Sequence, residues 1–129
     1  MRVTRFFTGP DKETHFEELE IPLEDHGVVS TSPRIPVDDV MVVDLHSPVG
    51  EARSHLNAPQ RQLVVMLSGT HEVCSASGEC RRWSKGEVFF PDDTSGHGHT
   101  TTVIEEPVRY LFIRLPEDFD PAPYRVAKG

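Results

Sequence analysis

The sequence predicts an all-β fold, either a sandwich, a jelly roll or a barrel, and three observations support this prediction. No segment places apolar residues at the i, i+3, i+4, i+7 spacing of an amphipathic helix, so we expect helix in under ~15% of residues. Eleven prolines and nine glycines divide the 129-residue chain into short pieces. Turn-forming residues separate these pieces at the close spacing that is typical of many short strands.

The expected strands follow one another between identifiable turns. The turn Gly9-Pro10-Asp11 separates Val3–Phe7 from Phe16–Ile21, and Ser47-Pro48-Val49-Gly50 ends Val40–Leu45. Ser68-Gly69 separates Gln62–Leu67 from His71–Cys74, and Ser77-Gly78 leads on to Cys80–Trp83. Lys85-Gly86 precedes Glu87–Phe90, and Glu105-Glu106-Pro107 separates Thr100–Ile104 from Arg109–Leu115. The aromatic residues Trp83, Phe89, Phe90 and Phe112 are expected in the core, because aromatic side chains bury a large apolar area.

The chain is long enough for a single domain over residues 1–129. We divide it into N-terminal strands and loop (1–39), a barrel (40–115) and a proline-containing tail (116–129) that wraps the surface or is loose. Met41–Val43 and Leu63–Leu67 are apolar on both strand faces and therefore need cover on both sides. An N-terminal strand or a second subunit could supply that cover, and we expect a homodimer.

Charge and composition restrict the partners. Thirteen Lys and Arg residues against 21 Asp and Glu residues give a formal net charge of −8, which argues against nucleic acid or an anionic membrane as a partner. No apolar run has the length of a membrane-spanning helix, and the N-terminus lacks the apolar region of a signal peptide, so a cytoplasmic location is expected. Cys74 and Cys80 could form a disulfide across a hairpin, but a reducing compartment favours two thiols. Their spacing excludes a CxxC metal pair.

The segment Asp92–Thr100 raises a question of chemistry, because it places His97 and His99 one glycine apart. In an extended strand, side chains at i and i+2 leave on the same face, so both imidazoles would point the same way. They could form part of a metal site, bind a substrate or belong to a polar turn.

Two segments around these histidines resemble the two motifs of the cupin superfamily. In the first, Gly50 is followed by His55-Leu56-Asn57, then Gln62 and Gly69; in the second, Gly86 is followed by Asp92, Thr94 and His97 at the spacing of that motif. The resemblance covers residues 50–99, and it implies a double-stranded β-helix, the jelly-roll cupin barrel.

The resemblance also implies a divalent metal in the barrel. Two of the four ligand positions keep a histidine, His55 and His97, whereas Asn57 replaces the second histidine and Gln62 replaces the glutamate. Neutral amides are weaker ligands, but His99 could compensate. The expected metal ligands are therefore His55, Gln62, His97 and His99, a set that suits Zn, Fe, Ni, Cu or Mn.

Other polar residues have candidate roles of their own. Arg61 could bind a substrate carboxylate or make a surface salt bridge, and Asn57 is a second candidate for substrate binding. Asp93 is a candidate general base, although a turn or cap role is commoner for aspartate in such a segment. His15 could cover the mouth of the pocket, but exposure is the simpler expectation. The remaining histidines, His26, His46 and His71, are expected on the surface.

These residues support two interpretations of function. The first is a small-molecule-transforming cupin enzyme with a divalent metal, whose reaction could be that of an oxygenase, isomerase, lyase or cyclase. The alternative is a non-catalytic, metal-free cupin that binds a small ligand, which the replacements at Asn57 and Gln62 favour.

Overall fold

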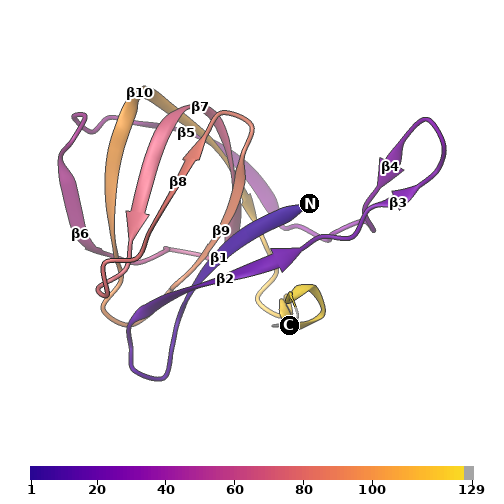
Figure 1. Ribbon diagram of the computed structural model, residues 1–129, viewed down its shortest axis with the longest axis horizontal. Helices are drawn as coiled ribbons and strands as arrows, with labels where there is room; N and C mark the ends of the chain where they lie inside the picture. Colours follow the sequence, from indigo (N-terminus) through magenta and orange to yellow (C-terminus); the bar gives the residue numbers. More distant parts are fainter. Residues whose placement is uncertain (127–129) are drawn as a thin grey trace.

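The regular secondary structure of the protein is almost entirely β-strand, as expected (Figure 1). A computed structural model describes residues 1–126. The main sheet contains β1 (Arg2–Thr8), β2 (Thr14–Glu20), β5 (Asp39–Leu45), β6 (Ala52–Leu56), β7 (Gln62–Cys74), β8 (Cys80–Ser84), β9 (Val88–Asp92) and β10 (His99–Arg114). The short strands β3 (Glu24–Asp25) and β4 (Ser30–Thr31) pair separately. The one helical segment in residues 1–126 is the 3-10 helix η1 (Ala122–Tyr124).

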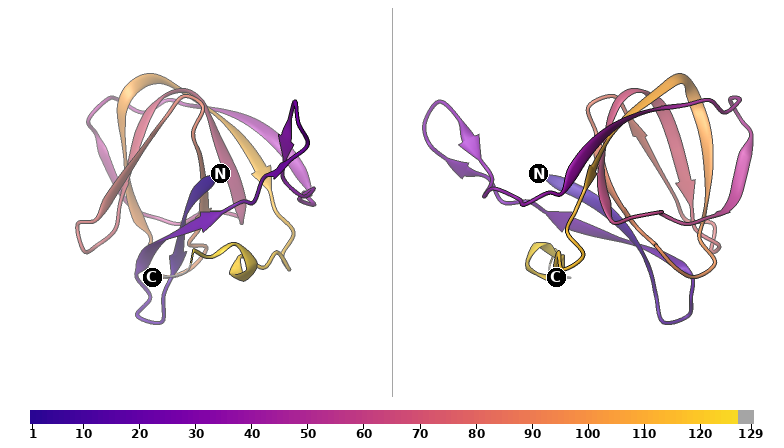
Figure 2. Two further views of the ribbon diagram at one scale, coloured as in Figure 1. Left: turned by 45° about the vertical axis from the view of Figure 1, so that its right-hand side comes forward. Right: turned by 180° about the vertical axis from the view of Figure 1, so that it is seen from behind.

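The main sheet is mixed and strongly curled. Its hydrogen-bonded path runs β2-β1-β9-β7-β10-β5, with β6 added to β10 and β8 added to β7. The pair β1–β9 is parallel, and the other pairs of the sheet are antiparallel. Seen from two further directions, the sheet curves around an interior, while the β3–β4 hairpin projects away from it (Figure 2). The path ends at β2 and β5, so β5 is an edge strand; β6 and β8, each paired with a single strand, are edges of the sheet as well.

The two long strands differ from the prediction, which divided each of them into two strands. Gly69 lies within β7 at φ +77°, where an added Cβ would collide with the carbonyl oxygens of Glu105 and Pro107. The pairing of β10 with β7 shifts register between Val103 and Tyr110. The residues read as turns therefore form bulges that bend two continuous strands. The prediction also missed β6 and the two short strands β3 and β4.

Two apolar clusters hold the fold together. The inner cluster contains Trp83 and Phe89, both buried as expected, and Phe112 packs against it half-buried. The outer cluster contains Phe90, with Leu63 and the tail residue Phe119 packed against it. The tail residue Phe119 therefore packs on the same outer cluster as Leu63 of β7, whereas Leu67 on that strand stays exposed. The part of the predicted tail that spans residues 127–129 lies outside the described residues.

Cys74 and Cys80 form a disulfide, so the expectation of two thiols is wrong. The reason is the register of the β7–β8 hairpin, which places the two cysteines directly opposite each other. The cytoplasmic location stays a prediction, and the disulfide weighs against it because such bonds persist mainly in oxidising compartments. Within residues 1–126, no helix has the length and apolar character needed to cross a membrane.

Candidate functional site

A cavity of about 310 Å³ lies between β1, β5, β6, β7, β9 and β10. This volume is at the lower end of the usual range for small-molecule sites, roughly 300–1,000 Å³. Its wall is largely apolar, and the apolar residues are Phe6, Leu45, Leu56, Ala58, Pro59, Val64, Val73, Phe89, Pro91, Val103 and Phe112. The polar residues on the wall are Ser47, Arg53, Asn57, Gln62, His71, His99, Thr101 and Tyr110.

A buried aspartate holds one of the cavity histidines. The carboxylate of Asp93 is completely buried and lies 2.5 Å from Nδ1 of His99. It also accepts hydrogen bonds from the Thr14 hydroxyl at 2.8 Å and from the backbone N–H of Ala58 at 3.2 Å. An ionised carboxylate can only accept, so Nδ1 of His99 carries its hydrogen and the lone pair of a neutral ring is on Nε2. His99 is therefore positioned as a base on the cavity wall.

Gly98 makes the side chains of His97 and His99 point in different directions. It has φ +76°, and its α-carbon lies so close to the backbone carbonyl of Leu56 that no Cβ fits. The left-handed conformation breaks the alternation of an extended strand, so the expectation that His97 and His99 share the interior face is wrong. His99 is buried, whereas the His97 side chain is 61% exposed and donates from Nδ1 to Glu13 at 2.6 Å.

The ligand atoms of the expected metal site do not converge on one position, although His55, His97 and His99 line one surface pocket and Gln62 and His99 both line the cavity. His55 has φ +58° and is exposed, and its Nδ1 lies 3.4 Å from the backbone oxygen of His97. Gln62 is buried in the cavity wall. Within residues 1–126, the one cluster of three or more His, Cys, Asp or Glu ligand atoms within 4.8 Å of one another is Glu72, Cys74 and Cys80, whose sulfurs form the disulfide. The imidazoles of His55, His97 and His99 therefore do not fit around one metal ion. The bound metal stays a prediction, and no group of ligands in residues 1–126 supports it.

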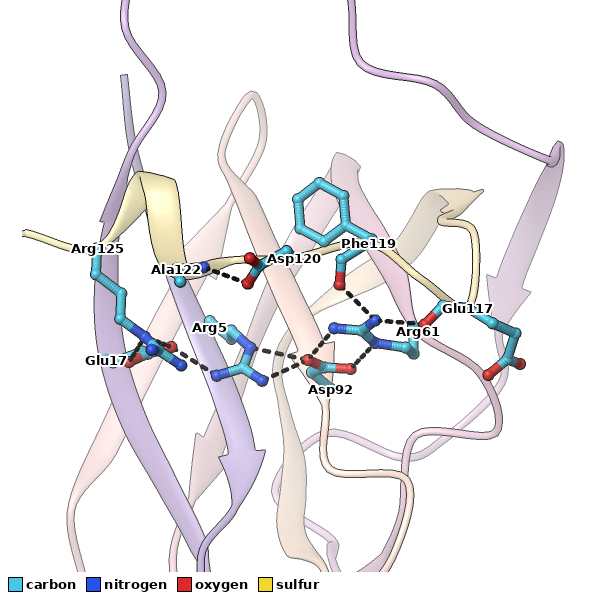
Figure 3. Close-up of polar contacts among 9 residues, drawn as sticks. All are labelled: Arg5, Glu17, Arg61, Asp92, Glu117, Phe119, Asp120, Ala122 and Arg125. Carbon is cyan, nitrogen blue, oxygen red and sulfur yellow. Dashed lines mark hydrogen bonds and ion pairs between the residues drawn. The ribbon is translucent and has the colours of Figure 1, made fainter.

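Arg61 and Asn57, the expected substrate-binding residues, have structural partners. Arg61 donates to both oxygens of Asp92, at 2.7 and 3.0 Å, and also to the backbone oxygens of Glu117 and Phe119 (Figure 3). It lies outside the cavity lining. Asn57 lines the cavity, but its amide donates to the backbone oxygens of Asp93 and Ser95. Both residues therefore fix the backbone around the site.

A second cavity histidine, His71, was expected on the surface and is in fact 4% exposed. It follows the Gly69 bulge on β7, and its Nδ1 lies 2.6 Å from the hydroxyl of Tyr110. Burial, and secondarily the nearby His99, lower the pKa of His71 to about 3. Burial also raises the pKa of Tyr110. Both side chains are neutral near pH 7, which makes the pair a neutral hydrogen-bonding group.

The sequence analysis gave no role to Tyr110 or Arg53, and its placement of His71 on the surface is wrong. The alternation of His71 with the buried Val73 was the available signal for an inward-facing histidine. Arg53 lines the cavity from β6, and it is exposed. Other histidines are exposed as expected, including His15, which bonds to Asp11 at 2.9 Å.

No protein-family model matches the chain, and no curated protein matches it in sequence. The site must therefore be interpreted from its own geometry, which combines an apolar cavity, an Asp–His pair and a neutral His–Tyr pair.

Proposed function

We propose that the protein is an enzyme of the cupin type, with a double-stranded β-helix, that binds a small organic molecule in the cavity and transfers a proton with His99. The observation that carries this proposal is the bond between the buried Asp93 and Nδ1 of His99. A carboxylate in this position fixes the tautomer of the imidazole and stabilises the imidazolium that forms when Nε2 accepts a proton.

The cavity provides suitable surroundings for such a transfer. Its wall is largely apolar, and an electrostatic interaction is stronger in apolar surroundings than in water. The ring of Phe6 contacts His99 edge to face at 5.0 Å between centroids and limits the orientation of the imidazole. Asp93 is itself held by Thr14 and Ala58. These contacts pre-organise the base before any ligand binds.

Deuterium exchange tests this proposal without knowledge of the natural substrate. The protein is incubated in D₂O with 2-tetralone, cyclohexanone and acetophenone, whose C–H groups next to the carbonyl are acidic, and incorporation is followed by mass spectrometry. We expect exchange above the buffer rate, and a loss of roughly 100-fold or more in His99→Gln. His97→Gln is the matched control, because it removes an exposed imidazole two residues away. Equal exchange rates in His99→Gln and the wild type would contradict the proposal.

The second candidate function is binding without catalysis. The largely apolar cavity wall and the dispersed predicted metal ligands favour it. The exchange experiment, together with ligand-observed NMR, separates the two functions. A protein that only binds would show ketone binding by NMR but no exchange of the ketone hydrogens.

We also propose that a second copy of the chain covers β5. This strand is an edge of the sheet, and Val40, Met41 and Val42 remain 59%, 55% and 61% exposed. Edge strands with exposed apolar side chains pair readily with another chain. Light scattering should give a dimer mass for the wild type and a monomer mass for Val42→Lys; a monomeric wild type at tens of micromolar would contradict this assembly.

A further inference from the structure

The buried pair of His71 and Tyr110 has one hydrogen more than its own contact uses. The two neutral side chains together carry two polar hydrogens, one on the imidazole and one on the phenol. One of these hydrogens occupies the 2.6 Å contact between Nδ1 and the hydroxyl oxygen. The other must lie either on Nε2 of His71 or on the Tyr110 oxygen, directed away from His71.

The surroundings of the imidazole favour the Tyr110 oxygen as the position of that hydrogen. Nε2 of His71 is sealed from solvent and has no hydrogen-bond partner within residues 1–126. Its ring lies edge to face with Trp83, Phe89 and Tyr110, at centroid distances of 5.7, 4.9 and 5.4 Å. Ring faces are weak acceptors, so a hydrogen on Nε2 would be poorly satisfied. A hydrogen on Nδ1 donates directly to Tyr110.

The Tyr110 hydroxyl is then a donor with its hydrogen directed away from His71. Tyr110 lines the cavity, and within residues 1–126 its hydroxyl has no partner other than His71. On the cavity wall this hydrogen can be satisfied by an oxygen of a bound molecule, whereas a hydrogen on the sealed Nε2 of His71 has no acceptor within reach. His71 positions this donor, and a phenol that stays protonated keeps its hydrogen available.

The donor and the base both line the same cavity, whose volume is about 310 Å³. Aromatic rings of the core lie behind them: the Phe6 ring lies 5.0 Å from His99 and 6.0 Å from Phe89, and the Phe89 ring lies 4.9 Å from His71. A molecule bound in this cavity therefore has both Tyr110 and His99 in its surroundings.

We infer that Tyr110, positioned by His71, donates a hydrogen bond to a carbonyl oxygen of the bound molecule, and that the substrate class is apolar carbonyl compounds with an acidic C–H. This inference rests on the proposed proton transfer by His99. Nε2 of His99 takes the proton from the carbon next to the carbonyl, and the C–H electron pair becomes a C=C bond. The carbonyl π pair moves to the oxygen, whose negative charge accepts from Tyr110. Return of the proton to the same or another carbon regenerates a carbonyl compound, so no oxidant, reductant or second reactant is needed.

The tautomer of His71 provides a test on the protein alone. Nitrogen-15 NMR of the histidine-labelled wild type distinguishes a ring with its hydrogen on Nδ1 from one with its hydrogen on Nε2. We expect the Nδ1–H form for His71 at pH 7. A predominant Nε2–H form would overturn the inference, because Tyr110 would then donate to His71 and have no hydrogen for a ligand.

A pair of matched probes tests recognition of the carbonyl. Acetophenone and α-methylstyrene have nearly the same shape, but only acetophenone has an oxygen acceptor. We expect acetophenone to bind more tightly to the wild type, and Tyr110→Phe to lower its affinity by about two- to tenfold while leaving α-methylstyrene unchanged. Equal effects on both probes, or no binding of acetophenone, would overturn the inference.

The two proposals fail in different ways. If Tyr110→Phe leaves the preference for acetophenone intact, the carbonyl assignment is wrong while proton transfer by His99 can still stand. If His99→Gln keeps the exchange rate of the wild type, the proposed function is wrong even where Tyr110 recognises the carbonyl. His97→Gln should change neither the probe affinities nor the exchange.

Discussion

Replacement of Asp93 by asparagine should switch the tautomer of His99. The carboxylate accepts from His99 and Thr14 through Oδ2 and from the Ala58 N–H through Oδ1. An asparagine of the same shape must place its NH₂ at one of these two positions. It then faces an N–H donor, either that of His99 or that of Ala58. The conflict with His99 is removed when the imidazole moves its hydrogen to Nε2, so we expect that outcome.

The magnitude follows from the contacts that change. Hydrogen bonds to a charged acceptor contribute about 1.5–3 kcal/mol each, against about 0.5–1.5 kcal/mol for neutral ones. Because Asp93 is completely buried, solvent cannot replace the lost interaction. We therefore expect Asp93→Asn to lower the free energy of unfolding by about 1–3 kcal/mol. With its hydrogen on Nε2, His99 has no lone pair towards the cavity, and the deuterium exchange rate should fall by roughly 100-fold or more.

Urea denaturation and the ketone exchange assay measure the two effects. The matched control is Asp11→Asn, which alters an Asp–His pair of the exposed surface, since Asp11 contacts His15 at 2.9 Å. The control should keep the stability and exchange rate of the wild type. Unchanged exchange in Asp93→Asn, with His99 still carrying its hydrogen on Nδ1, would refute this account of the pair.

Three further predictions concern the surrounding framework. Gly98→Ala should lower the stability in urea denaturation by more than Gly78→Ala does. Both glycines have positive φ, so both substitutions carry the left-handed penalty of ~1–2 kcal/mol, but an added Cβ collides with its surroundings only at Gly98. Equal losses of stability would contradict the close approach of Gly98 to Leu56. Arg61→Met should lower the free energy of unfolding by about 1–3 kcal/mol, because the buried Asp92 loses two hydrogen bonds. It should leave the affinity for acetophenone unchanged; weaker binding would indicate that Arg61 contacts the substrate after all. The pKa of His71 is about 3 in the folded state and about 6.5 unfolded, so the unfolded chain binds the proton first as the pH falls. Stability should decline from about pH 6.5 to pH 3 by up to ~1.4 kcal/mol per pH unit, and His71→Leu should flatten this decline in pH-dependent denaturation; identical slopes would contradict a buried neutral imidazole.

The strand content could be predicted from the sequence, but the course of the two long strands could not. Alternating and apolar segments identified most strands correctly, because burial of one face imposes a period of two. Gly69 and Pro107 were predicted to lie in turns. Glycine and proline occur both where a chain reverses direction and where a continuous strand bulges, so the residue type alone does not distinguish the two cases. The distinction depends on the backbone carbonyls that approach Gly69 from the other long strand, and those contacts are distant in sequence.

The site was predictable in part. Asp93, Gln62, Asn57 and His99 were identified, and all four lie in or directly behind the cavity wall. The joint direction of His97 and His99 was not predictable from the spacing, because a single left-handed glycine reverses it. His71 was placed on the surface because a lone histidine in a strand shows no motif, and its alternation with the buried Val73 was not used. Its importance comes from Tyr110, a partner 39 residues away.

A crystal structure of the complex with 2-tetralone tests the central claim most directly. We predict that the ketone lies in the cavity, with its carbonyl oxygen about 2.6–3.2 Å from the Tyr110 hydroxyl and an adjacent CH₂ group facing Nε2 of His99. A ketone bound with its oxygen away from Tyr110, or bound outside the cavity, would contradict the account.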